Sequence, residues 1–510
     1  MNFSWYTRAL LAIASGVALG LSFPNYNLAL LAWISVGLLV LASVGAPPKQ
    51  APLYGFLHGL AFYPVCVPWI DTVMHKYGDV DPLTSAGLVL LLAATFGLML
   101  TIFSWGVAQV SRKGVGFACG LAPALWVAVE LLRTRLPILG FPWCLSGYAA
   151  TGSLALLQVV SVTGIYGLSL LVAGYGSLFA YAVLVRRGSV WKILLATSAL
   201  LILAGTEGKY LVPLAKVDHI AHLVQTDFPQ SEEYPSNWLQ VHAADMNELE
   251  EISVNAARRT PGIVIWPEVP APFSLQDLNF QQRAVRIAQR ADQYFLVGIV
   301  DWKLEGGGKW IATNSAVLLD PSGRRVFTYD KIHLVPFGEY VPLRKYLTFA
   351  KRLTADISDF TPGTEYRVGA IPGGRIGVFI CYESIFPDEI RRFAKGGATL
   401  LVNISNDGWF GRSSAPAQHL MMVRVRAVES RRWLLRDTNN GFTVSIDPYG
   451  RIVAELEPDV RGQLDAPYGF RTDESLYVRF GDWLAWVCVA ASIALLALTF
   501  FKRPLAGTGA

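Results

Sequence analysis

One cysteine of this chain stands where a nucleophile could act. The segment GVFICYESIFPDE, residues 377–389, places Cys381 at the end of an apolar run and two residues before Glu383. A thiol nucleophile needs a base that removes its proton and donors that stabilise the oxyanion formed on a carbonyl substrate. The position therefore predicts covalent catalysis if such groups lie nearby, and otherwise an inert buried cysteine at a strand end.

Two other segments supply groups of this kind. GIVIWPEVP presents Glu268 directly after an apolar run, and YDKIHLVPFGEYVP presents Lys331 and Glu339 among turn residues. Side chains at the carboxyl ends of strands converge on one site in open α/β folds. For a base beside a thiol, His333 in the second segment and His419 in APAQHLMMVRVRA are also candidates. Each charged residue, taken alone, fits a solvated surface position equally well.

The composition indicates that a large part of the chain lies in a membrane. Of the 510 residues, 53 % are hydrophobic and only 16 % are charged, against about 25 % charged in an average soluble domain. The net charge of +5 comes without a basic block that contains aromatics, which argues against nucleic-acid binding. Apolar stretches near the bilayer-crossing length of about 20 residues lie at 5–23, 27–45, 51–70, 84–110, 115–132, 157–185, 191–206 and 482–501. We therefore predict a polytopic α-helical membrane domain with about eight spans.

Residues 209–478 have a different character. Charges are frequent, and short apolar runs such as GIVIWPE and ATLLVNISND are bounded by turn residues. Helical segments at 237–259 and 277–292 lie between these strands, which indicates an α/β domain. The predicted organisation is a membrane domain of seven helices over 1–208, the α/β domain over 209–478, and a final transmembrane helix with its tail over 479–510.

Loop charges predict the orientation of the chain. With a cytoplasmic N-terminus, nine Lys and Arg residues fall on the inside and three in the outer loops, and positive charge favours the cytoplasmic side. Seven crossings then place the α/β domain outside the cytoplasm. In a bacterium the protein would be a multi-pass protein of the inner membrane with this domain in the periplasm.

This orientation sets Cys381 apart from the other cysteines. Cys66, Cys119, Cys144 and Cys488 lie in or beside apolar spans, where a small buried hydrophobe is expected. A structural cysteine in an oxidising compartment normally has a partner, so a single one suggests a reactive thiol.

The charged segments together resemble a known pattern. IWPE, YDKIHLVPFGEYVP and CYE present Glu, Lys and Cys in the chain order of the nitrilase superfamily, and NISNDGWFG, a downstream QH and RAVESRRWLLRDTNNG are further matches. A nitrilase-like domain between seven membrane spans and one more resembles the apolipoprotein N-acyltransferase family, over essentially the whole chain. The resemblance implies that the α/β domain is an αββα sandwich.

The resemblance also implies a set of catalytic residues. Glu268 would be the base, Lys331 the cation that stabilises the thiolate and the oxyanion, and Cys381 the nucleophile. Three further positions match supporting residues of the family, namely Glu339, Tyr382 and Glu383. Glu339 would orient Lys331 or share the proton transfer. Strand-end packing of Tyr382 and a surface position of Glu383 are the alternatives.

The implied reaction is ping-pong. The thiol would take the sn-1 acyl chain of a phospholipid, typically phosphatidylethanolamine, as a thioester. The α-amino group of the diacylglyceryl cysteine of an apolipoprotein would then accept it, giving a triacylated lipoprotein. No metal, nucleotide or other cofactor is implied. The alternatives are a membrane-anchored nitrilase or amidase acting on a small amide, and a transporter or receptor with a degenerate nitrilase module.

The segment near PQS contains two aromatic residues that could bind the second substrate. The family usually has an aromatic residue, typically Trp, three positions after the serine of PQS, and uses it for the second substrate. Here PQSEEYPSNW has Tyr234 at that spacing and Trp238 four residues later, so either could serve.

The segment VPLRKYLTFAKRLTADISDF, residues 341–360, predicts a short basic amphipathic helix that lies in lipid headgroups or packs on the domain.

Overall fold

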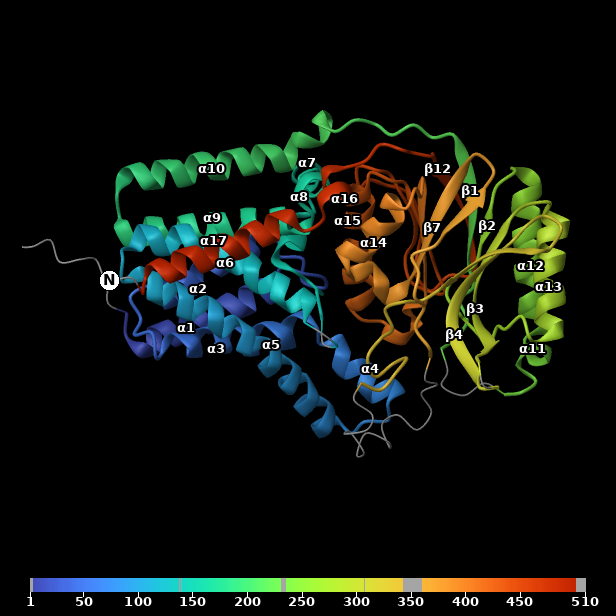
Figure 1. Cartoon of the computed structure of the whole chain (residues 1–510), viewed down its shortest axis with the longest axis horizontal. Helices are drawn as coiled ribbons and strands as arrows, with labels where there is room; N and C mark the ends of the chain where they lie inside the picture. Colours follow the sequence, from blue (N-terminus) through green and yellow to red (C-terminus); the bar gives the residue numbers. More distant parts are fainter. Residues whose placement is uncertain are drawn as a thin grey trace, which may run out of the picture.

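The computed structural model describes residues 3–136, 138, 140–230, 235–306, 308–342 and 360–500. These residues form two bodies that lie side by side along the long axis of the molecule (Figure 1). We call them the helical bundle (α1 to α10 with α17) and the α/β sandwich (β1 to β12 with α11 to α15). Tyr234 and nearly all of the predicted amphipathic helix lie outside the described residues.

The helical bundle contains most of the apolar stretches. Its helices are α1 (Trp5–Gly20), α2 (Leu30–Ser43), α3 (Ala51–Cys66), α4 (Trp69–Tyr77), α5 (Pro82–Ser111), α6 (Val115–Arg135), α7 (Leu154–Leu157), α8 (Val160–Thr163), α9 (Ile165–Val185), α10 (Gly188–Thr206) and α17 (Trp483–Leu498). By length and composition, four of the described helices could cross a membrane: α5, α6, α9 and α10. The pair α3 and α4, bent by 59° at its break, would make a fifth.

The prediction of about eight spans is therefore not confirmed by the helix lengths. The helices α1, α2 and α17 contain 16, 14 and 16 residues, fewer than the roughly 20 that cross a bilayer without other adjustment. The stretch 157–185, predicted as one span, is broken between α8 and α9 by Gly164, whose φ is 65°. A left-handed residue cannot continue a right-handed helix, and hydropathy alone does not detect such a break.

Small residues allow the helices of the bundle to approach closely. A Cβ on Gly37 of α2 would lie 2.3 Å from the carbonyl oxygen of Gly176 of α9. Helices in lipid associate through such close packing, because lipid supplies no hydrophobic force between them. In the most apolar 18-residue window of α10 only 11 % of the residues are buried, so this helix has a large apolar surface suited to lipid.

The α/β sandwich contains two sheets within the described residues. The first sheet has the order β12 (Gly462–Tyr468), β1 (His219–Gln225), β2 (Val264–Ile265), β3 (Phe295–Leu304), β4 (Trp310–Leu319) and β5 (Arg325–Asp330). The second has the order β11 (Ile452–Leu456), β10 (Thr443–Ile446), β9 (Leu434–Thr438), β8 (Leu400–Ser405), β7 (Gly374–Ile380) and β6 (Val368–Ile371). In each sheet three neighbouring strands are parallel, β1 to β3 and β7 to β9, and the strands outside them pair antiparallel.

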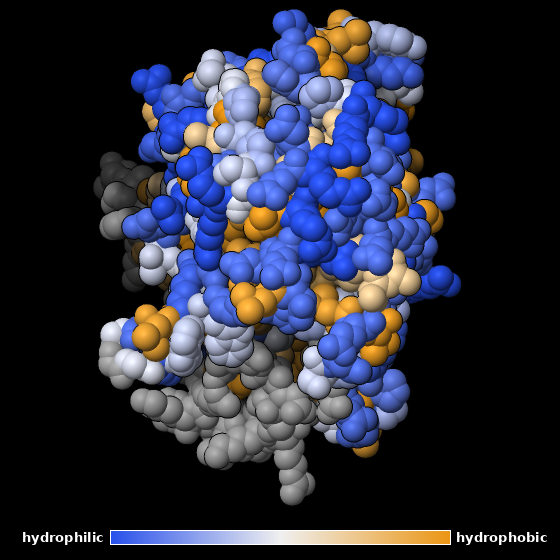
Figure 2. All heavy atoms as spheres, turned by 90° about the vertical axis from the view of Figure 1, so that its right-hand side faces the viewer, coloured by the Kyte–Doolittle hydropathy of each residue, from blue (hydrophilic) through white to orange (hydrophobic). Residues whose placement is uncertain are grey.

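Helices cover the outer face of each sheet. The first sheet carries α12 (Ala243–Arg259) and α13 (Leu278–Ala291), while α14 (Pro387–Lys395) and α15 (Ala415–Ser430) cover the second sheet on the side of the bundle (Figure 1). The predicted αββα layering is confirmed. The end of the sandwich opposite the bundle has a mostly hydrophilic surface (Figure 2), as a domain surrounded by water requires.

A glycine in β3 leaves room for the segment that follows β2. A Cβ on Gly298 would lie 2.4 Å from the carbonyl oxygen of Pro267 and 2.7 Å from the Cα of Glu268. Both contacts involve backbone, which cannot rotate away.

We therefore expect Gly298→Ala to destabilise the protein by about 1–3 kcal/mol, the usual range for an overpacked interior. Gly306, in the β3–β4 connection, is the matched control, because a Cβ there meets nothing within 4 Å. The thermal unfolding temperatures of both variants in detergent measure the difference. Equal unfolding temperatures would show that the backbone after β2 can shift without loss of stability.

Candidate active site

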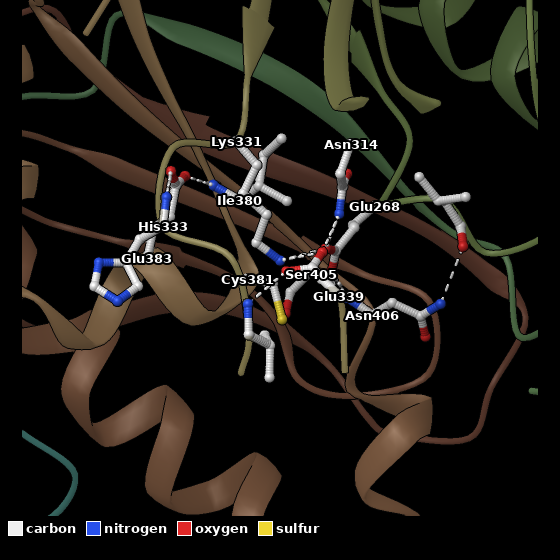
Figure 3. Close-up of polar contacts among 12 residues, drawn as sticks. Glu268, Asn314, Lys331, His333, Glu339, Ile380, Cys381, Glu383, Ser405 and Asn406 are labelled. Carbon is white, nitrogen blue, oxygen red and sulfur yellow. Dashed lines mark hydrogen bonds and ion pairs between the residues drawn. The ribbon is translucent and has the colours of Figure 1, made fainter. Parts of the chain in front are cut away.

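Cys381 directly follows β7 and begins the 3₁₀ helix η4 (Cys381–Ile385). Its φ is 48°, in the left-handed region that residues other than glycine seldom adopt. The residue is only 7 % exposed. The turn aims the thiol into a cluster of charged groups contributed by other strand ends (Figure 3).

Lys331 lies at the centre of this cluster, directly after β5. Its Nζ donates hydrogen bonds to Oε1 of Glu268 at 3.0 Å and to Oε1 of Glu339 at 2.9 Å (Figure 3). The lysine side chain is 1 % exposed. Although burial disfavours its charge, the two carboxylates hold the pKa of Lys331 well above its ordinary value. The residue is therefore a fixed cation.

Side-chain and backbone amide groups donate further hydrogen bonds to the two carboxylates. Asn314 of β4 donates from Nδ2 to Oε1 of Glu268 and to Oε1 of Glu339, both at 2.8 Å. The backbone N–H of Asn406, after β8, donates to the other oxygen of Glu268 at 2.9 Å. The backbone N–H of Val335 donates to Oε2 of Glu339 at 2.8 Å. Each carboxylate is thus held in one orientation.

The electrostatics of the thiol follow from this arrangement. Burial raises the pKa of Cys381 well above its ordinary value, and the negative charge of Glu268 raises it further, whereas the Lys331 ammonium acts in the opposite direction. The resting group is a thiol. A reaction at the sulfur needs a base in contact range, and the carboxylates beside the sulfur are the groups that could accept its proton.

Glu383 has a different function from the charges near the sulfur. Its carboxylate points away from Cys381 (Figure 3). It accepts four hydrogen bonds, from the Tyr329 hydroxyl and the N–H of Ile332 at 2.7 Å, from the N–H of His333 at 3.2 Å, and from the N–H of Ile380 at 2.7 Å. Burial raises its pKa to about 7, and these hydrogen bonds oppose the rise. Through these hydrogen bonds Glu383 links the backbone after Lys331 to the end of β7.

Neither histidine candidate is placed as a base for the thiol. The imidazole of His333 stacks on Phe386 with 3.7 Å between ring centroids, and its Nδ1 lies 2.9 Å from Oε1 of Glu389. His419 is fully buried, and its Nε2 lies 3.1 Å from the backbone oxygen of Cys381. It therefore contacts the nucleophile's main chain.

The remaining predicted residues lie around this cluster. Tyr382 is buried beside Phe386, with 5.4 Å between ring centroids. Trp238 begins α11 (Trp238–Val241) and packs in an aromatic cluster with Phe228 and His242, at 4.9 and 4.4 Å between centroids. Tyr234 lies outside the described residues, so the choice between Tyr234 and Trp238 remains open.

Several residues of the site are not among those predicted from the sequence. Asn314 could have been noticed as one of three polar residues, TNS, in a strand that is otherwise apolar. Asp407, in the NDGWFG motif, accepts from Arg436 NH2 at 2.7 Å and from the Ser405 hydroxyl at 2.9 Å. Arg436, which is in the matched segment RAVESRRWLLRDTNNG but was not predicted as a site residue, lies in β9 and is fully buried. Its charge holds the pKa of Asp407 well below the ordinary value against the effect of burial.

A cavity of about 520 Å³ adjoins the segment after Lys331. Its lining combines Arg135 and Leu136 from the end of α6 with Ile332, Tyr340 and Phe386 from the sandwich. The cavity therefore lies where the two bodies meet. Among the described residues, no group of three or more His, Cys, Asp and Glu side chains is arranged to hold a metal ion.

The two sheets and the buried Glu–Lys–Cys cluster define a nitrilase-like α/β domain. The Carbon-nitrogen hydrolase family model matches residues 233–466, and the model of the Apolipoprotein N-acyltransferase N-terminal domain matches residues 15–178. The amidase from Nesterenkonia sp., a solved structure, is 19 % identical and covers 52 % of this chain and 94 % of its own, with a TM-score of 0.38.

Relatives match the whole chain. The apolipoprotein N-acyltransferase of Geobacter metallireducens is 36 % identical over 511 residues, covering 97 % of this chain and 96 % of the relative. That of Methylococcus capsulatus is 31 % identical over 504 residues, with 97 % and 96 % covered. The chain belongs to the apolipoprotein N-acyltransferase family.

The charges around the thiol predict opposite effects of two substitutions. Glu268→Gln removes a negative charge that raises the thiol pKa, so the pKa should fall. Lys331→Met removes a positive charge that lowers it, so the pKa should rise. The rate at which iodoacetamide alkylates Cys381, followed as a function of pH by peptide mass spectrometry, measures both. Shifts in the same direction would contradict this account of the site.

Proposed function

We propose that this protein transfers an acyl chain from a phospholipid to the α-amino group of the N-terminal diacylglyceryl cysteine of an apolipoprotein. Membership of the family supports this activity. The observation that carries the mechanism is the contact of the Lys331 ammonium with the Glu268 and Glu339 carboxylates beside the buried Cys381 thiol. The proposed catalytic residues are Glu268, Lys331 and Cys381.

The first half-reaction forms a thioester. Sγ of Cys381 attacks the sn-1 ester carbonyl of the phospholipid while Glu268 accepts the thiol proton. The Lys331 ammonium stabilises the oxyanion of the tetrahedral intermediate. When the intermediate collapses, the ester C–O bond breaks and Glu268 returns the proton to the departing oxygen. The products are a lysophospholipid and the acylated cysteine, with phosphatidylethanolamine as the proposed donor.

The second half-reaction transfers the chain to nitrogen. The neutral α-amino group of the acceptor attacks the thioester carbonyl, and Lys331 again stabilises the oxyanion. The C–S bond breaks as the amide forms, and Glu268 passes the proton lost by the amine to the departing sulfur. Glu339 and Asn314 maintain the orientation of Lys331 and Glu268 during both steps.

The supporting residues have proposed functions of their own. Glu383 positions the Lys331 segment through its hydrogen bonds to the N–H groups of Ile332 and His333. Tyr382, next to the nucleophile, lies against Phe386, which lines the cavity between the two bodies. That cavity is suited to an acyl donor that arrives from the membrane, because one of its walls is the end of α6.

A membrane-anchored nitrilase or amidase is the second candidate, because the same three residues can hydrolyse a small amide. A bundle this large exceeds what an anchor requires, since one helix is sufficient. The two candidates differ in the acceptor. An amidase would release ammonia from a small amide, whereas an acyltransferase would require a lipid donor and an amine.

Acylation of Cys381 tests the activity. Mass spectrometry of the protein mixed with phospholipid vesicles should find an acyl adduct on Cys381, and Cys381→Ala should abolish it. Glu268→Gln and Lys331→Met should slow its formation by about 10²–10⁴-fold, the usual cost of a lost acid–base or oxyanion group. Cys488→Ser is the control and should retain the wild-type rate. An undiminished adduct in Cys381→Ala would refute the mechanism.

Reporter fusions test the proposed topology. We propose eight spans, with residues 1–208 forming seven of them, 209–478 in the periplasm, and 479–510 returning the chain to the cytoplasm. The loop charges favour this orientation. Alkaline phosphatase, which is active only in the periplasm, should be active when fused after Gly363 and inactive after Arg503. The reverse pattern would place the thiol in the cytoplasm.

A further inference from the structure

One buried glutamine connects the α/β sandwich to three separate parts of the helical bundle. Gln418, in the first turn of α15, is fully buried. Its Oε1 accepts from Nε1 of Trp143 at 2.6 Å and from Nε1 of Trp69 at 3.1 Å. Its Nε2 donates to the carbonyl oxygens of Pro24 at 2.6 Å and Cys66 at 2.8 Å.

These four contacts satisfy the side chain completely. An amide oxygen accepts two hydrogen bonds and an amide nitrogen donates two, and Gln418 makes all four with atoms of the bundle. The opposite orientation of the amide would place N–H groups against both indole N–H groups, so the partners determine the orientation. A glutamine held in this way specifies how α15 sits on the bundle.

The next residue contacts the nucleophile. Nε2 of His419 lies 3.1 Å from the backbone oxygen of Cys381 and 2.6 Å from the Ser384 hydroxyl. The other ring nitrogen, Nδ1, lies 3.1 Å from NH2 of Arg436 and 3.2 Å from Oδ1 of Asp407. The imidazole also stacks on Trp143, with 5.7 Å between centroids and 29° between planes.

The main chain at Cys381 needs such support. Its left-handed φ of 48° is unfavourable for a residue with a side chain. Glu383 holds the preceding N–H, that of Ile380, at 2.7 Å, and His419 holds the carbonyl that follows. The second of these contacts depends on where α15 begins, and Gln418 sets that position.

Hydrogen bonds within the bundle fix the position of Trp143. The segment that carries Trp143 follows α6, and NH2 of Arg133 in α6 donates to the Trp143 carbonyl oxygen at 3.2 Å. Oε1 of Glu130, one turn earlier, accepts the N–H of Ser146 at 2.7 Å. A continuous path of contacts therefore runs from α6 through Trp143 to Gln418 and His419.

We propose that Gln418 and His419 are positioning residues through which the helical bundle sets the position of the Cys381 thiol. The thiol then reaches its reactive geometry only when the sandwich is docked on the bundle. The inference rests on the proposed function in one respect, because it takes Cys381 as the nucleophile. It adds that the bundle takes part in forming the site as well as holding the protein in the membrane.

The test compares two glutamines that both join the sandwich to the bundle. Gln418→Leu removes the connection to the thiol. Gln158→Leu is the matched control, since Gln158 donates to the Tyr449 carbonyl at 2.9 Å and accepts from Arg431 at 2.6 Å, at the opposite end of α15. Full-length protein in phospholipid vesicles is assayed for the rate of Cys381 acylation, for the pH profile of its alkylation by iodoacetamide, and for thermal unfolding.

We expect Gln418→Leu to slow acylation by about tenfold or more, the size of effect produced by a displacement of the reacting atom of less than 1 Å. The pH profile of alkylation should shift as well, because the sulfur moves relative to Glu268 and Lys331. Gln158→Leu should keep the wild-type profile and lose less than threefold in rate. Equal rates and identical profiles for the two variants, per folded molecule, would overturn the proposal.

Trp143→Phe decides the question if Gln418→Leu does not fold. It removes one hydrogen-bond donor to Gln418 and keeps a ring against His419, and it should also shift the alkylation profile. An unchanged profile in Trp143→Phe would then overturn the proposal. If the wild-type protein forms no acyl adduct, the acyl-transfer function fails, while the alkylation profiles still test the positioning of the thiol.

Discussion

The site depends on keeping a lysine ammonium buried between two carboxylates. Burying an ion costs several kcal/mol unless other groups compensate it, and one cation against two anions leaves a negative charge. The protein compensates that charge with N–H donors: the Asn314 amide, shared between Glu268 and Glu339, and the backbone of Asn406 and Val335. These donors come from the middle of β4, from the residue after β8 and from the loop after β5, so both sheets must place their segments together for the site to form.

The paired sheets meet this requirement. In each sheet three parallel strands end at the same edge, and the two edges bring Glu268 after β2 close to Cys381 after β7. Lys331 directly follows β5 of the first sheet, where its backbone N–H donates to the Asn314 carbonyl at 2.8 Å, and a loop begins there. Glu383, anchored at the end of β7, binds that loop through two of its N–H groups. One carboxylate outside the reacting cluster thus connects the cation to the nucleophile.

The second sheet faces the helical bundle, and this arrangement has a consequence for the chemistry. The helices that cover this sheet, α14 and α15, also pack against the bundle (Figure 1). The bundle side contributes Trp143 and the end of α6, while the sandwich contributes the thiol and its charged partners. A lipid acyl chain and a buried thiol can meet in such a place, because the apolar bundle and the polar cluster border the same region.

The sequence by itself determined the local features. Runs such as GIVIWPE and GVFICYE predict strands that end in a charged or nucleophilic residue, because an apolar run that gives way to polar and turn residues is typical of a buried strand and its end. The αββα layering was implied by the family resemblance, and the residues Glu268, Lys331, Glu339 and Cys381 followed from those runs together with that resemblance. The structure brings these four side chains together. Helix ends were less predictable, since the break at Gly164 depends on one backbone conformation that hydropathy does not reflect.

Only the tertiary structure decided which polar groups meet. Asn314, Arg436 and Gln418 are polar residues within ordinary elements, and their side-chain partners lie between 17 and 394 positions away in the chain. Local patterns report the burial of a segment, because hydrophobic periodicity acts over a few residues. The choice of hydrogen-bond partner depends on which segments the fold brings within 3 Å, and that depends on the packing of the whole chain.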